Sequence, residues 1–142
     1  MVAVLDDHLL RDVLADDLSA ELAQILDEHE PATTNLYLYR LSRSVVLARG
    51  GALTGSWSVE HRRELGRALI ALPDSVQVVP MRVLVFRMAE IAEAQRVSTL
   101  GAEAAAAAEH LAAALCVWEG DDGPGIRTAA GAVGAPYRTV VR

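Results

Sequence analysis

Residues 2–8 read VAVLDDH, a short apolar run that ends abruptly in two aspartates and a histidine. Continuously apolar runs of this length are typical of strands that are buried on both faces of a parallel sheet. The change to Asp6 and Asp7 predicts that this strand reaches its carboxyl end there. Leucine and isoleucine then recur every three or four residues as far as Leu26, which predicts helix with a fresh start near Ser19 and an end at Pro31.

Short β-rich runs alternate with helical periodicity along the rest of the chain. The five predicted strands are residues 2–5, 32–34, 76–79, 114–118 and 136–140. Asn35 and Ser58 are predicted helix caps, and the alanine-rich residues 101–114 form a predicted central helix. Strands that alternate with helices favour right-handed crossovers. We therefore predict an α/β fold, with three α/β/α layers around a parallel five-stranded sheet and one domain over residues 1–142.

The composition excludes several classes of function. The formal net charge is −6 and every one of the 13 basic residues is an arginine, so broad electrostatic binding of nucleic acid is disfavoured and any such contact is local. The absence of lysine excludes Schiff-base chemistry. The single cysteine, Cys116, lies in an apolar run and is predicted to be a small buried hydrophobe. No run approaches the ~20 apolar residues of a membrane span, so we expect a cytoplasmic protein with no membrane partner.

Acidic side chains follow the predicted strands at the points where they end. Asp6 and Asp7 follow the first strand, and Glu119, Asp121 and Asp122 follow the fourth. Carboxyl ends of parallel strands share one edge of a sheet, and ligands bind at that edge. Converging carboxylates suit Mg²⁺ or Mn²⁺, which could activate water against a phosphodiester.

A structural interpretation of the same residues stays open. Asp121 and Asp122 are also ordinary turn residues, and Asp7 is also an acid favoured by a helix N-terminus. Asp6 differs, because a carboxylate at the end of a buried strand costs free energy unless it is paired. The four histidines are dispersed without the spacing of a zinc site, so His8 is predicted to be an ordinary surface or helix-end residue.

Several segments together resemble the PIN domain over nearly the whole chain. They are VLD at 4–6 before a leucine-rich helix, TTNL at 33–36, the alanine-rich helix from Gly101, LCVWE at 115–119 and GAPYRTV at 134–140. PIN domains are metal-dependent nucleases, and many are ribonuclease toxins of the VapC type. The resemblance implies a five-stranded parallel sheet, an acidic pocket with Mg²⁺ or Mn²⁺, a homodimer and an antitoxin-like protein partner.

The family's acidic residues are only partly present. Asp6 matches the first family aspartate, and Glu119 falls where the family has an aspartate, with Asp121 as a nearby substitute. Arg40 stands at the position of the family glutamate. Gly101 stands at the position of the aspartate that opens the alanine-rich helix, with Glu103 as the nearest acid.

The exchange of a carboxylate for Arg40 changes the site charge by two units, and a guanidinium cannot ligate a cation. We expect Arg40 to pair with Asp6 or Glu119 in the place of the metal. The resulting hypothesis is a PIN-like domain with an impaired metal site that binds RNA or a protein partner rather than cleaving, with no cofactor.

The alternative is an active Mg²⁺- or Mn²⁺-dependent endoribonuclease, with Asp6 and Glu119 as catalytic residues, Asp7 and Asp121 as further metal ligands, and Glu103 assisting. The acidic start also resembles a phosphorylation receiver domain. That reading fails, because Pro80 and Met81 stand where the phosphorylated aspartate belongs and the chain has no lysine.

Overall fold

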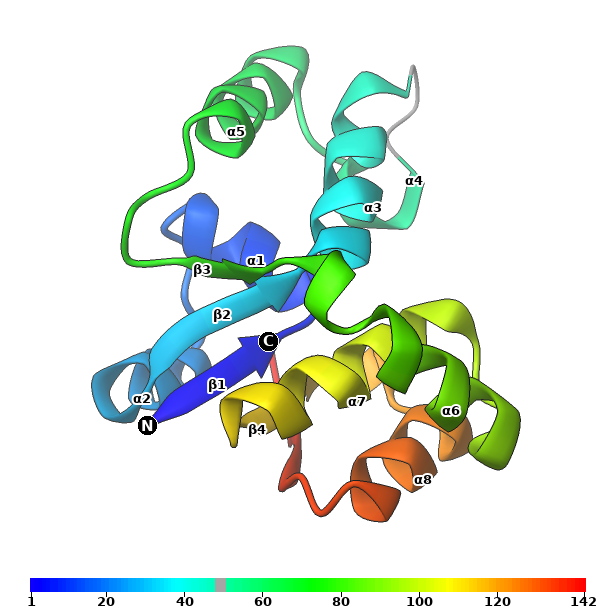
Figure 1. The fold of residues 1–142 in the computed structure, drawn as a ribbon. Coiled ribbons are helices and arrows are strands. Elements are labelled where there is room, and N and C mark those ends of the chain that lie inside the picture. The colour runs from blue at the N-terminus through cyan, green and yellow to red at the C-terminus, as the bar shows by residue number, and fades with distance from the viewer. Residues whose placement is uncertain (48–50) are drawn as a thin grey trace.

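The computed structural model describes residues 1–47 and 51–142, and these form one sheet of five strands (Figure 1). The strands are β1 (Val2–Leu5), β2 (Glu30–Thr34), β3 (Gln77–Val79), β4 (Ala114–Trp118) and β5 (Tyr137–Val140). All four neighbouring pairs are parallel, in the order β3-β2-β1-β4-β5. The predicted α/β class and the parallel five-stranded sheet are therefore confirmed.

One face of the sheet is covered by α6 (Val85–Gln95), α7 (Thr99–Leu111) and α8 (Pro124–Ala132). In Figure 1, α7 crosses in front of the sheet with α6 and α8 beside it. The side chains of α7 from Ala104 to Ala108 are buried, and their small size lets the helix lie close to the strands. Val4 and Leu115 of the central strands face this layer.

The opposite face is covered by α1 (Asp7–Leu14) and α2 (Ala20–Glu28), which lie behind the strands in Figure 1. Ala3, Leu5 and Cys116 point toward these helices, so alternate strand residues supply the two faces. Cys116 is buried, as predicted.

A third group of helices stands above the sheet in Figure 1 and packs on α1. It consists of α3 (Asn35–Val46), the short α4 (Gly51–Thr54) and α5 (Val59–Ile70). Leu10, Leu41 and Leu65 form the core that joins these helices. Two single-turn 3₁₀ segments, η1 (Met81–Val83) and η2 (Glu119–Asp121), follow β3 and β4.

The helix boundaries follow local capping chemistry. Ser19 and Ser58 each accept a hydrogen bond from a backbone N–H of the helix that they precede, and Ser19 starts the predicted second helical segment. Two details of the prediction are wrong. Thr34 rather than Asn35 caps α3, and Pro31 lies inside β2 because the preceding helix already ends at Glu28.

The strand order creates a switch point at the centre of the sheet. The chain moves from β1 outward through β2 to β3, and then returns to the other side of β1 to form β4 and β5. The connections after β1 and β4 therefore diverge, which opens a crevice at their carboxyl ends. In the described part of the chain no helix is both long and apolar enough to cross a membrane.

Candidate metal and ligand site

Asp6 links the carboxyl ends of β1 and β4, the two neighbouring strands at the switch point. It is the residue after β1 and the cap of α1, where Oδ1 accepts a hydrogen bond from Leu9 N at 2.9 Å. Its Oδ2 accepts a second bond from Trp118 N at the end of β4, also at 2.9 Å. The carboxylate is 1% exposed, so these backbone donors supply part of the pairing that its burial requires.

Asp7 and His8 form the first turn of α1 and are both buried. His8 Nδ1 lies 2.6 Å from Asp121 Oδ2 and 3.4 Å from Asp7 Oδ1. The imidazole also packs against the indole of Trp118, with 4.4 Å between the ring centroids. His8 is therefore a helix-end histidine, as one of the two predicted alternatives had it, but it is buried rather than on the surface.

Asp121 reaches the cluster from η2, which continues from β4. The turn is held by Asp122, whose carboxylate accepts hydrogen bonds from Arg127 Nη2 and Tyr137 Oη, both at 2.8 Å. The Arg127 guanidinium also lies over the Tyr137 ring, 4.8 Å from its centroid. Asp122 is thus a turn residue, while its neighbour Asp121 faces His8.

The four side chains of Asp6, Asp7, His8 and Asp121 meet at one place. One ligand atom from each lies within 4.8 Å of those of the others. Asp6, Asp7 and Asp121 also line a cavity of about 300 Å³. The donor set of three carboxylates and one imidazole could therefore hold a metal ion.

Arg40 enters the same site from α3. Its Nη1 lies 3.3 Å from Asp7 Oδ2, an oxygen that is buried and accepts no hydrogen bond. The partner of Arg40 is thus Asp7, and not Asp6 or Glu119 as expected. About half of the Arg40 side chain (51%) is exposed, so the guanidinium closes one side of the cavity while it faces solvent with the other.

The other three residues of the sequence-based site, Glu119, Gly101 and Glu103, are not among those that meet at the cluster. Glu119 is exposed at the start of η2. Gly101 lines the cavity without offering a ligand. Glu103 is fully buried one half-turn further along α7, and its Oε1 accepts a hydrogen bond from Leu36 N in the first turn of α3. Glu103 therefore orients α3, the helix that carries Arg40.

Burial and charge shift the acid–base properties of the cluster. Burial raises the pKa of Asp6 to about 7, and the charges of Asp7 and Asp121 add to this effect against the hydrogen bonds from Leu9 and Trp118. Burial lowers the pKa of His8, but the carboxylates of Asp121 and Asp7 outweigh it and raise the pKa to about 9. Near neutral pH the imidazole is therefore a cation, and Asp6 is partly protonated.

These shifts predict a loss of stability at high pH in the absence of metal. The pKa of His8 rises from 6.5 to about 9 on folding, so its contribution is complete below pH 6.5 and is lost as the pH passes through about 9. Asp6 has the same sign, because its pKa rises from 3.8 to about 7. We expect the free energy of unfolding, measured by urea denaturation with EDTA, to be smaller at about pH 10 than at about pH 6.

His8→Gln should remove the part of this pH dependence that lies above pH 6.5, while His110→Gln, at an exposed site on α7, should leave it unchanged. Equal pH profiles of the wild-type protein and His8→Gln would contradict the assignment.

The signal that could have identified His8 lies in its position. It follows Asp6 and Asp7 immediately after a buried strand, whereas zinc-like spacing concerns only histidines and cysteines that are close in sequence.

No protein-family model matches this sequence, and no curated protein matches it significantly.

Proposed function

We propose that this chain is a PIN-like domain that binds single-stranded RNA at the acidic end of its sheet and does not cleave it. The observation that carries the proposal is the pair of protein cations inside the acidic cluster. The Arg40 guanidinium lies 3.3 Å from Asp7, and His8 Nδ1 lies 2.6 Å from Asp121. Two cations against three carboxylates leave little net negative charge to attract Mg²⁺.

Hydrolysis of a phosphodiester by a PIN-type site requires a cation that activates water and stabilises the developing charge. Neither Arg40 nor Gly101 supplies the carboxylate that the family has at these positions. A guanidinium donates hydrogen bonds to phosphate but cannot activate water in this way. The residues present therefore support binding of a phosphate more than its hydrolysis.

Two arginines on one face of α3 suit the RNA backbone. Arg40 borders the acidic cavity, and Arg43, one turn later, lines a second cavity of about 230 Å³ that shares Arg40 and Asp121 with the first. About two phosphate contacts predict weak binding, with a slope of log K against log salt of about −1.4 for a single strand. This agrees with a chain whose net charge of −6 permits only local contacts with nucleic acid.

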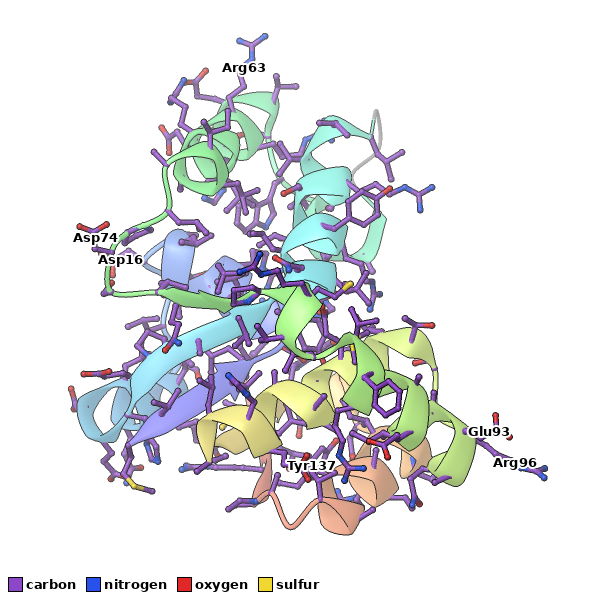
Figure 2. All side chains as sticks on the ribbon, viewed as in Figure 1. Asp16, Arg63, Asp74, Glu93, Arg96 and Tyr137 are labelled. Carbon is purple, nitrogen blue, oxygen red and sulfur yellow. The ribbon has the colours of Figure 1, made fainter. Side chains whose placement is uncertain are left out.

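Binding and cleavage can be measured on one labelled single-stranded RNA. We expect Arg40→Gln to weaken binding by about 10- to 150-fold, because a charge-assisted contact with phosphate contributes about 1.5–3 kcal/mol. Arg63→Gln is the matched control, since Arg63 is exposed on α5 and its side chain points away from the rest of the molecule (Figure 2). Fluorescence anisotropy gives the affinity, and denaturing gels show whether the RNA stays intact.

Equal affinities of the wild-type protein and Arg40→Gln would contradict the role of Arg40. An absence of RNA binding would contradict the proposal and favour the antitoxin-like protein partner or the homodimer that the family resemblance implies. Tyr39 and Val46, exposed on α3 to 61% and 80%, are candidate residues for such a contact.

The second candidate is an Mg²⁺- or Mn²⁺-dependent endoribonuclease of the VapC type. It is favoured by the approach of Asp6, Asp7, His8 and Asp121 to within 4.8 Å of one another. This candidate predicts RNA fragments that require the metal and that disappear in Asp6→Asn. Such fragments would replace the binding proposal by the nuclease.

A further inference from the structure

One wall of the 300 Å³ cavity beside the acidic cluster is apolar. It is formed by the half-buried side chains of Val97, which precedes α7, Leu100 in the first turn of α7 and Ile126 in the first turn of α8. Gly101 adds no side chain to this wall, because a Cβ there would lie 2.5 Å from Val97 Cγ2. Arg96 also borders the cavity, but its side chain points away from the molecule (Figure 2). Such a wall gives the face of a nucleobase a surface to pack against.

A second observation is a buried hydroxyl group in the same cavity. Tyr37, in the first turn of α3, lines the cavity and is only 3% exposed. Its backbone N–H donates to Thr34 Oγ1, but its hydroxyl group makes no hydrogen bond within residues 1–47 and 51–142. Burial raises the pKa of Tyr37 well above its ordinary value, and the charges of Asp6 and Asp7 add to this effect, so the hydroxyl stays protonated. A buried donor without a partner costs free energy, which an acceptor atom of a ligand would recover.

The remaining wall of the cavity is rich in hydrogen-bond acceptors. Asp7 and Asp121 line it, and Arg40 pairs with Asp7 where the cavity meets solvent. An ionised carboxylate accepts hydrogen bonds but donates none. Guanine fits this arrangement, because its N1–H and 2-amino groups are adjacent donors and its O6 is an acceptor beside them. Uracil fits poorly, because its two carbonyl oxygens would face carboxylates.

We propose that this cavity takes one guanine base of the bound RNA, with its N1–H and 2-amino groups toward Asp7 and Asp121 and its O6 toward the Tyr37 hydroxyl. The proposal rests on the proposed function, since it names the base that the RNA-binding site selects. Unstacked bases of single-stranded RNA expose their Watson–Crick edges and are read in this way. Arg40, half exposed at the same cavity, is then the partner of the nucleotide's phosphate.

Isothermal titration of the full-length protein in EDTA with guanosine, inosine and uridine 5′-monophosphates tests the proposal. We expect the guanosine nucleotide to bind at least about 10-fold more tightly than the uridine nucleotide. Inosine monophosphate lacks only the 2-amino group of guanine, and it should bind about 10-fold more weakly than guanosine monophosphate.

Tyr37→Phe removes the hydroxyl group and keeps the ring. We expect it to weaken binding of guanosine monophosphate by about 3- to 10-fold. Its free energy of unfolding should not fall, because the hydroxyl bonds to no group in the described part of the protein. Tyr39→Phe is the matched control, since Tyr39 is 61% exposed on the same helix, and it should bind the nucleotide like the wild-type protein.

Equal affinities for the guanosine and uridine nucleotides, or no binding of guanosine monophosphate, would overturn the proposal. So would equal binding of guanosine monophosphate by the wild-type protein and Tyr37→Phe. RNA binding without this preference would remove only the guanine pocket. A preference for guanosine monophosphate without RNA binding would support the pocket and contradict only the RNA-binding function.

Discussion

Replacement of Asp12 by alanine is expected to lower the free energy of unfolding by about 3–5 kcal/mol. Asp12 and Arg11 are both buried on α1, and Asp12 Oδ1 accepts bonds from Arg11 Nε at 3.0 Å and Nη2 at 2.8 Å. Arg142 also donates to this carboxylate, with Nε 2.5 Å from Oδ2. Alanine would leave the Arg11 guanidinium buried without its carboxylate, which is far costlier than the loss of an exposed pair.

Urea denaturation of the Asp12→Ala and Glu109→Ala variants separates a buried pair from an exposed one. Glu109 pairs with Arg87 at 2.8 Å on the surface, and its removal should cost less than about 1 kcal/mol. Both carboxylates pair with arginine, and they differ in burial and in the second arginine, Arg142, that also binds Asp12. Similar losses in the two variants would show that the Arg11–Asp12 pair is not sequestered from solvent.

Replacement of Glu103 by alanine is expected to lower the free energy of unfolding by about 2–4 kcal/mol. Glu103 is 0% exposed, and its removal leaves a cavity between α7 and the start of α3 and an unpaired N–H on Leu36. Burial raises the pKa of Glu103, while the Leu36 N–H and the Thr34 hydroxyl oppose that shift. Glu103→Gln keeps the volume and an acceptor oxygen, so it should cost less than half as much.

Thermal and urea denaturation of the two Glu103 variants test this role. The structural role requires that the alanine variant lose more stability than the glutamine variant. If both variants kept wild-type stability, Glu103 would not hold α3, and the position of Arg40 would need another cause.

The sheet could be predicted from sequence because each strand is a short β-rich run, and β1 and β4 are also almost entirely apolar. The sharpest case is β1, where Leu5 is followed by Asp6 and the observed strand ends at Leu5 as predicted. Helix starts at Ser19 and Ser58 were also predictable, since a hydroxyl that accepts a bond from the first turn acts locally. Pro31 misled the prediction because it lies in the first residues of a strand, where proline is tolerated.

The composition of the site could be predicted only in part. Topology alone brings the ends of β1 and β4 together, and this accounts for the meeting of Asp6 with Asp121. The choice between Glu119 and Asp121 depends on the single 3₁₀ turn of η2, which directs the first outward and the second toward His8. The strand pattern gives no information on such a turn.

The partner of Arg40 depends on contacts between distant segments. Thr34 caps α3 and Glu103 binds its first turn, and together they fix the rotation of the helix about its axis. That rotation directs Arg40 to Asp7, the residue next to the expected Asp6. A sequence position shows that a guanidinium replaces a carboxylate, but the buried partner follows from packing.

Arg40 and His8 are proposed to hold the acidic cluster in the place of Mg²⁺. The most direct measurement is the affinity and integrity of one labelled single-stranded RNA with the wild-type protein, in EDTA and in Mg²⁺ at equal ionic strength. We expect the same affinity in both buffers and intact RNA at the end of the incubation. Binding that requires Mg²⁺, or fragments that form only with Mg²⁺, would contradict it.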